Sequence, residues 1–141
     1  MKVFVDTNVM LDYISKRSAC YDDDRAIMES FRSGRHKGYI AAHSVTDAFY
    51  ILRKEYSDEE RRTLLALYLD LVHVVRTDKD KIISALERKD FHDFEDCLQD
   101  ECAFACGSDY IVTRNVKDFE QSKVKAITPA DFIKTSGLER S

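Results

Sequence analysis

The stretch Lys2-Val3-Phe4-Val5-Asp6 decides the fold. Three apolar residues in a row, followed by an acid, predict a short strand that is buried on both faces, as in a parallel sheet. Four later apolar runs resemble it, and segments of helical pattern separate them. We therefore expect strands at Lys2–Asp6, Tyr39–Ala42, Val72–Arg76, Tyr110–Thr113 and Lys125–Ile127.

The segments between these strands begin with helix start signals, in which short polar side chains precede an apolar periodic run. The expected helices are Asn8–Lys16, Arg25–Arg32, Ser44–Glu55 and four that open at Ser57, Thr77, Asp93 and Thr128. Alternation of strands and helices predicts an α/β fold. We expect a three-layer α/β/α sandwich with a central, roughly five-stranded parallel sheet, formed by one domain over residues 1–135, and a C-terminal tail at 136–141.

Composition agrees with this expectation and limits the function. A chain of 141 residues suits one core, and 4 glycines with 1 proline are few turn residues for a β-sandwich or barrel. The formal net charge is −4, which excludes nucleic-acid binding by bulk electrostatics. If the chain binds RNA, its acids must be clustered and neutralised by metal, with basic side chains around them.

The start of the chain and its cysteines indicate a cytoplasmic protein. Lys2 and Asp6 interrupt the apolar start, so a secretory signal is not expected, and no apolar run is long enough to span a membrane. Cys97, Cys102 and Cys106 form no C-x-x-C pair. We expect reduced thiols that pack in the core rather than a zinc site.

Acidic side chains fall at the carboxyl edge of the predicted sheet, where ligands bind in such folds. Asp6 ends the first strand, and Asp47 and Asp96 lie in first turns of helices next to the second and fourth strands. Asn115 and Asp118 follow the fourth strand. Two unit charges about 4 Å apart repel by roughly 4 kcal/mol at an effective dielectric near 20, and a hard divalent cation removes that cost. Oxygen ligands without a thiolate cage favour Mg²⁺ or Mn²⁺.

Each acid except Asp6 also has a plain structural interpretation. Asp47 fits the third position of a capping box behind Ser44, and Asp96 fits a cap that starts at Asp93. Asp118 fits a solvated loop. An acid that closes an apolar strand gains nothing from the core, so Asp6 favours function.

Several segments together resemble the PIN-domain family, and the PIN-family toxins of bacterial toxin–antitoxin pairs in particular. The segments, whose order and spacing match over nearly the whole chain, are Val3-Phe4-Val5-Asp6-Thr7-Asn8-Val9-Met10-Leu11, Asp93-Phe94-Glu95-Asp96-Cys97-Leu98-Gln99, Ile111-Val112-Thr113-Arg114-Asn115-Val116-Lys117-Asp118-Phe119 and Thr128-Pro129-Ala130-Asp131-Phe132. The resemblance implies Mg²⁺- or Mn²⁺-dependent hydrolysis of RNA by a metal-activated water, a small antitoxin as partner, and dimerisation as a further possibility.

The resemblance also implies roles for individual residues. Asp6, Asp96 and Asp118 would hold metal, and with Asp47 they would form the catalytic set. Substrate or ligands would be oriented by Thr7, Asn8, Thr113, Arg114 and Asn115. Two positions depart from the family pattern: Asp47 stands where Glu is frequent, and Asn115 stands where many members have Asp. Asn115 lacks the charge of an aspartate, and this loss should weaken a second metal site more than the first.

Other interpretations remain open at this point. Basic residues expected near the site are Lys16, Arg17, Arg53, Lys54, Arg114 and Lys117, which could bind phosphates or be ordinary surface charge. A phospho-accepting receiver domain would use Asp78 after the third strand. A phosphohydrolase with an Asp nucleophile would want an acid where Asn8 stands, because an amide cannot act as a general acid. A PIN fold that binds RNA or protein with a lapsed site would explain Asp47 and Asn115.

Overall fold

A computed structural model describes residues 1–16 and 19–140 of the chain. The strands are β1 (Lys2–Val5), β2 (Lys37–Ala41), β3 (Val72–Val75), β4 (Tyr110–Val112) and β5 (Ala126–Ile127). The helices are α1 (Thr7–Ser15), α2 (Tyr21–Arg32), α3 (Ala42–Ile51), α4 (Asp58–Leu69), α5 (Lys79–Glu87), α6 (Phe94–Ala105) and α7 (Pro129–Ser136), with short 3-10 helices η1 (Leu52–Lys54) and η2 (Val116–Phe119).

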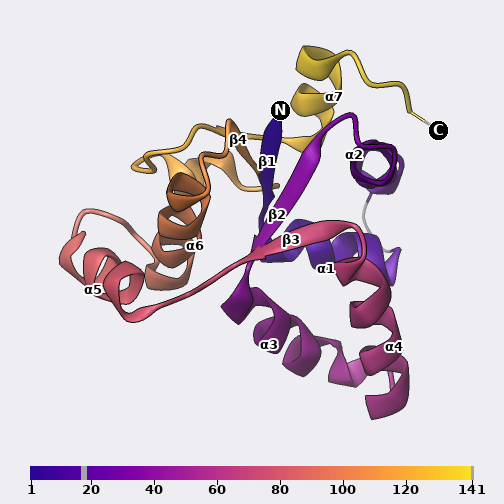
Figure 1. Ribbon diagram of the computed structural model, residues 1–141, viewed down its shortest axis with the longest axis horizontal. Coiled ribbons are helices and arrows are strands. Elements are labelled where there is room, and N and C mark those ends of the chain that lie inside the picture. Colours follow the sequence, from indigo (N-terminus) through magenta and orange to yellow (C-terminus); the bar gives the residue numbers. More distant parts are fainter. Residues whose placement is uncertain (17–18, 141) are drawn as a thin grey trace.

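The five strands form one parallel sheet in the order β3-β2-β1-β4-β5 (Figure 1). β1 lies at the centre, where Phe4 stands opposite Tyr39 on one side and Ile111 on the other. Helices cover both faces, so the predicted α/β/α architecture is confirmed. The carboxyl ends of β1 and its neighbours therefore open at a shared edge, where the predicted acids lie.

The core has two parts, one on each face of the sheet. Val3 and Val5 point toward the larger part, which α1, α2, α4 and α7 complete. Phe4 and Ile111 point the other way, toward α6 and η2. Each inner strand alternates its side chains between two covered faces, which explains why the strand sequences are continuously apolar. Cys97 and Cys102 are buried free thiols in the second part, as predicted.

Two helix starts were predicted wrongly. α2 begins at Tyr21 rather than Arg25, with Asp22, Asp23 and Asp24 in its first turn, where carboxylates favour the positive end of the helix dipole. α3 begins at Ala42 rather than Ser44 and has no side-chain cap. The Ser44 hydroxyl instead accepts a hydrogen bond from Thr7 Oγ1 at 2.7 Å. The capping-box interpretation of Asp47 is therefore excluded.

A second group of acids lies under the surface between α1 and α2, and we call Asp12, Asp23 and Asp24 the inner acids. All three are buried. Arg114 Nε pairs with Asp12 at 2.8 Å, and Arg140 pairs with Asp23. Neither carboxylate oxygen of Asp24 has a hydrogen-bond partner among residues 1–16 and 19–140. Burial, followed by the charges of Asp12 and Asp23, raises the pKa of Asp24 to about 7.

The segment after α7 is in contact with the rest of the fold. Gly137 ends α7 in the left-handed region at φ 71°, Leu138 packs against the larger core, and Arg140 reaches Asp23. Ser141 lies outside the described residues, as does Arg17. Over the two described ranges, no helix is both long and apolar enough to cross a membrane.

Candidate active site

Asp6 occupies the carboxyl end of β1 and the position just before α1. Its carboxylate accepts hydrogen bonds from Thr113 Oγ1 at 2.8 Å and Gln99 Nε2 at 3.0 Å. The residue is 3% exposed. Burial raises the pKa of Asp6, and the two hydrogen bonds partly oppose that shift. Residues 93 and 107 positions away thus fix the orientation of this carboxylate.

Asp96 lies in the first turn of α6. Its backbone N–H donates to Asp93 Oδ1 at 2.9 Å, so Asp93 caps the helix and the Asp96 carboxylate does not. Burial, followed by the charges of Asp6, Asp93, Glu95 and Asp118, raises the pKa of Asp96 to about 7. β1, α6 and η2 therefore bring Asp6 and Asp118 into electrostatic range of Asp96.

Asp47 lies at the side of this cluster. Burial and then the charge of Glu95 raise the pKa of Asp47, while His43 lowers it. One ligand atom from each of His43, Asp47 and Glu95 can be chosen so that all lie within 4.8 Å of one another. Asp47 therefore lies near the cluster on the side of Glu95. We call Asp6, Asp47, Glu95, Asp96 and Asp118 the edge acids.

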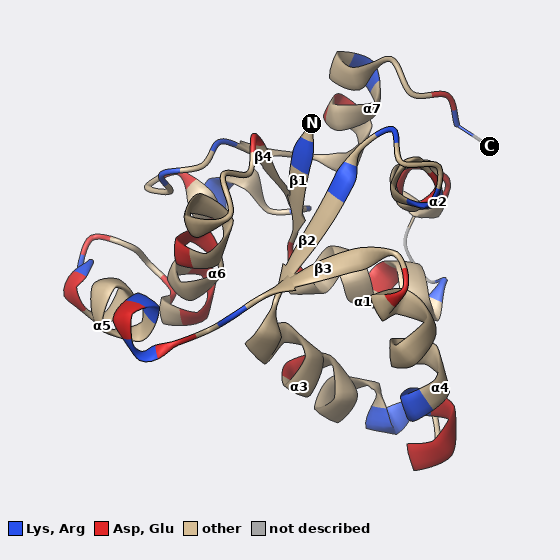
Figure 2. Cartoon of the chain, in the orientation of Figure 1, with Lys and Arg blue, Asp and Glu red and all other residues tan. Residues whose placement is uncertain are grey.

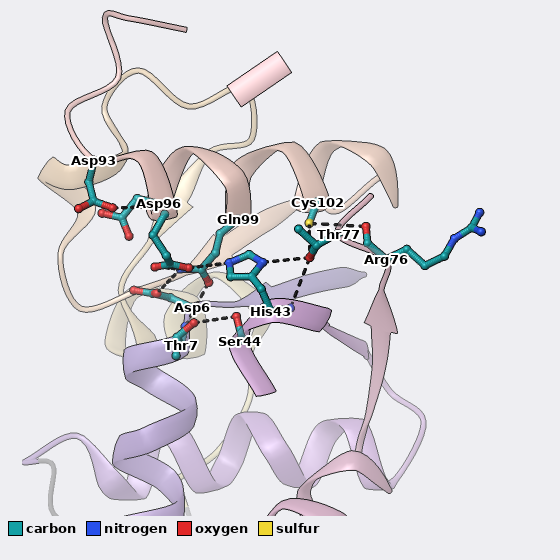
Figure 3. A network of polar contacts seen from close by, with 11 residues as sticks. Asp6, Thr7, His43, Ser44, Arg76, Thr77, Asp93, Asp96, Gln99 and Cys102 are labelled. Carbon is teal, nitrogen blue, oxygen red and sulfur yellow. Dashed lines mark hydrogen bonds and ion pairs between the residues drawn. The ribbon is translucent and has the colours of Figure 1, made fainter. Parts of the chain in front are cut away.

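Glu95 and Gln99 were not singled out from the sequence, although they join the parts of the site. Glu95 accepts from Gln99 Nε2 at 3.1 Å and lies 2.7 Å from His43 Nε2. The other ring nitrogen of His43 lies 2.9 Å from Thr77 Oγ1. Figure 3 shows this chain of contacts running from Thr77 past His43 to Gln99 and Asp6. The available signal was spacing, since residues 95 and 99 share one face of a helix.

The predicted orienting residues divide into two kinds. Thr7 donates its backbone N–H to Gln99 Oε1 at 3.1 Å, and Thr113 also accepts the Asn115 N–H at 3.1 Å. These contacts hold the site together from within. Asn8 and Asn115 are exposed. Arg114 turns away from the edge acids to pair with Asp12.

The donor set suits a hard cation. Within the described ranges, two groups bring three ligand atoms within 4.8 Å of one another: His43, Asp47 and Glu95, and Asp93, Glu95 and Asp96. Both are rich in carboxylate oxygen, which Mg²⁺ and Mn²⁺ prefer. Asp6 belongs to neither group, so the prediction that it holds the cation directly stays a prediction.

The receiver-domain alternative does not fit this fold. A receiver has the strand order 2-1-3-4-5, which places the third strand beside the first. Here β3 is an edge strand, separated from β1 by β2. Asp78 caps α5 by accepting the Lys81 N–H at 3.2 Å. This aspartate is a helix cap, remote in the sheet from Asp6.

A family model described as PIN domain matches residues 2–117. The chain belongs to the PIN-domain family. The resemblance recognised from the sequence is thereby confirmed, and the edge acids of this PIN domain occupy the edge where that resemblance placed its metal site. None of the curated proteins matches the chain.

Solved structures share the fold of this PIN domain at low sequence identity. DNA-bound VapBC from Salmonella typhimurium has 19% identity and a TM-score of 0.66, covering 92% of this chain and 98% of that one. A toxin–antitoxin complex from Klebsiella pneumoniae has 18% identity and a TM-score of 0.65, covering 90% and 97%. The sarcin–ricin loop cleaving toxin VapC20 from Mycobacterium tuberculosis has 15% identity and a TM-score of 0.61, covering 77% and 86%.

Proposed function

We propose that this PIN domain is a cytoplasmic Mg²⁺- or Mn²⁺-dependent endoribonuclease and the toxin of a toxin–antitoxin pair. The observation that carries the proposal is the gathering of acids around Glu95 and Asp96, whose ligand atoms lie within 4.8 Å of each other and of Asp93; burial and the four neighbouring acids also raise the pKa of Asp96 to about 7. Such crowding costs free energy in a protein without metal, and a divalent cation relieves it. Perturbed carboxylates that share one cleft are typical of functional sites.

The edge acids would contribute differently to binding of the cation. Asp6 and Asp96 would bind it, with Asp118 near Asp96 and with Asp47 and Glu95 on the other side. A bound divalent cation supplies positive charge to the scissile phosphate and a water of lowered pKa as nucleophile. Thr113 and Gln99 fix the Asp6 carboxylate by hydrogen bonds, so the site is oriented before substrate arrives.

Similar structures support the toxin assignment. One relative is described as a toxin that cleaves the sarcin–ricin loop, and another was solved as a toxin–antitoxin complex. By analogy, we expect a small antitoxin protein as the partner of this chain and RNA as its substrate. Growth arrest on expression of wild type, but not of Asp6→Asn, would support this role, and equal growth with both would count against it. Homodimerisation and the 1–135 domain limit stay predictions.

The direct test is cleavage of RNA by three proteins, each with Mn²⁺ and with a chelator. The proteins are wild type, Asp6→Asn and Asp90→Asn, the last being a control at an exposed aspartate between α5 and α6. We expect cleavage by wild type and Asp90→Asn in Mn²⁺ alone. Equal cleavage in every sample would end the proposal, because it would reveal a contaminating nuclease.

A second candidate is a PIN fold that binds RNA or protein with a lapsed site. It is favoured by Asn115, which offers a neutral amide where many family members carry a charge. Thermal unfolding separates the two, since an intact site is stabilised by Mn²⁺ through mass action, by about 2.7 kcal/mol at a hundredfold excess over Kd. No rise in Tm with Mn²⁺, together with no cleavage, would favour the lapsed site.

A further inference from the structure

A large exposed aromatic side chain stands beside the edge acids. Tyr50 lies on α3, three residues after Asp47, and is 62% exposed. It lines a shallow hollow of about 170 Å³ together with Thr7, Asn8, Asp47, Ile51 and Glu95. Pockets that enclose small molecules usually measure about 300–1,000 Å³. A ligand at this hollow must therefore lie across it, against the Tyr50 ring.

Arg53 holds the ring from one side. Its guanidinium carbon lies 3.7 Å from the centroid of the Tyr50 ring. Its Nη1 also donates to the Tyr50 carbonyl oxygen at 2.9 Å. One face of the ring is thus covered by a stacked cation, and the exposed area belongs mainly to the other face and the edge. The ring is a supported flat surface with a positive charge behind it.

The charge pattern around Tyr50 suits a polyanion that approaches from this side. Arg53 and Lys54 lie in η1, immediately after α3. Figure 2 shows blue at the segment after α3 beside blue on α4, whose first turn is red with Asp58, Glu59 and Glu60. Arg62 is paired with Asp58 at 2.6 Å, so Arg53 and Lys54 are better placed to meet phosphates.

We propose that Tyr50, backed by Arg53, is a stacking platform for a base of single-stranded RNA next to the scissile phosphate. Aromatic side chains bind bases by stacking whatever their sequence, because every base has a π face. In a duplex both faces of a base are already stacked, so the platform selects unpaired RNA. The inference rests on the proposed function, for which it names the substrate class as single-stranded.

The chain contains a matched control for ordinary surface aromatics. Phe104 on α6 is 58% exposed, and Lys123 Nζ lies 4.9 Å from its ring centroid. It is eight residues beyond Asp96 on one helix, which corresponds to about 12 Å along the axis. Phe104 therefore matches Tyr50 in exposure and in having a cation partner, but it lies away from the edge acids. If exposure alone bound RNA, both positions would contribute.

The first experiment measures affinity without cleavage. Every protein carries Asp6→Asn, a chelator is present, and binding of a dye-labelled single-stranded RNA is followed by fluorescence anisotropy. We expect Tyr50→Ala to raise Kd by roughly 5-fold or more, which is the lower end for loss of one stacked base. Tyr50→Phe should stay within about twofold because its ring can still stack. Phe104→Ala should leave Kd unchanged.

The second experiment detects stacking directly. The sequence has no tryptophan, so Tyr50→Trp introduces a single fluorescent reporter. We expect its emission to be quenched by single-stranded RNA and much less by a duplex of the same sequence. The reporter Phe104→Trp should respond to neither. Circular dichroism of each variant verifies that the fold is intact.

The outcomes distinguish this inference from the proposed nuclease. Equal Kd for Tyr50→Ala and its parent would overturn the stacking platform. Tyr50 would then be either part of a contact with another protein or an ordinary surface residue. No binding of RNA by any protein would overturn it as well. Cleavage of RNA by wild type in Mn²⁺ would still uphold the nuclease in either case. Conversely, loss of affinity in Tyr50→Ala together with no cleavage by wild type would uphold the platform alone.

Discussion

The edge acids and the inner acids pose the same electrostatic problem in two ways. Both groups gather carboxylates away from water, and one member of each, Asp96 and Asp24, has a pKa raised to about 7. Two arginines, with side chains 44% and 53% exposed, pair with the buried Asp12 and Asp23. Among the described residues no arginine or lysine forms an ion pair with an edge acid, and the hydrogen-bond partners of the edge acids include Thr113, Gln99 and His43.

The difference indicates how a carboxylate cluster can be assigned to function. The paired arginines offset much of the negative charge of the inner acids, which leaves that cluster little affinity for a cation. A cluster that has no arginine or lysine partner keeps most of its negative charge, and its hydrogen bonds keep its orientation; both favour a divalent cation. The contrast predicts that metal stabilises the protein through the edge acids and leaves the inner acids unaffected. The four changes below test that contrast.

The largest effect is expected for Asp96→Asn. Removing the most crowded edge acid should reduce Mn²⁺-dependent RNA cleavage by about 10³-fold or more, equivalent to about 4 kcal/mol. It should also abolish the rise in Tm that Mn²⁺ causes, measured by thermal unfolding. Asp24→Asn serves as the control and should keep both. An undiminished Tm rise in Asp96→Asn would contradict the contrast.

Asp24→Asn should change stability with pH instead. The folded-state pKa of Asp24 is about 7, above its ordinary 3.8, so the folded state binds the proton more tightly. The stability that protonated Asp24 contributes is therefore fully present below about pH 4, and it is lost as the pH rises through 7. At pH 8 we expect the variant to exceed wild type by about 2–4 kcal/mol in urea unfolding, with no difference at pH 4. A difference independent of pH would show that Asp24 is not the titrating group.

Arg114→Gln removes the cation that pairs with Asp12 and leaves that aspartate buried. Breaking a buried pair costs about 3–5 kcal/mol, but Arg114 is partly exposed and water screens part of that charge. We therefore expect a loss of about 1–2 kcal/mol in the free energy of unfolding. Arg62→Gln, which breaks an exposed pair with Asp58, should cost much less, because water screens the charges of a surface pair. Similar losses of free energy of unfolding in both variants would mean that the buried position of Asp12 does not strengthen its pair with Arg114.

The smallest effect is expected for His43→Ala. Its ring supports Glu95 at 2.7 Å, while Gln99 supports the same carboxylate at 3.1 Å and remains in the variant. Cleavage in Mn²⁺ should fall by only about threefold, which is less than 1 kcal/mol. His43→Gln can still donate to Glu95 and should recover most of that loss. A loss as large as that of Asp96→Asn would make His43 part of the catalytic set.

The fold could be predicted largely because the strand signal is local. Runs such as Val3-Phe4-Val5 contain it in full, and the caps at Ser57, Asp93 and Thr128 do so as well. The start of α2 was missed because its first turn has three aspartates and few apolar residues. The start of α3 was misplaced because Ser44 has a distant partner, Thr7, that a local pattern does not reveal.

The site could be predicted only as far as strand ends locate it. Asp6, Asp96 and Asp118 follow from the position of parallel strands, because their carboxyl ends meet at one edge. Gln99 could not be inferred from position, since its amide joins residues 92 and 93 positions away. The inner acids were missed for a similar reason: aspartates at the start of α2 resemble solvated surface, and packing of α1 against α2 buries Asp23 and Asp24 together with Asp12 of α1.

Consecutive residues after β4 serve opposite clusters, because the Thr113 hydroxyl donates to Asp6 while the Arg114 guanidinium pairs with Asp12. The start of the loop that leads to Asn115 and Asp118 is therefore fixed by contacts with both acid clusters before any ligand binds. Crystals grown with and without Mn²⁺ should superpose along this loop, with any adjustment confined to carboxylate rotamers. The proposed cation site would then be preformed along this loop.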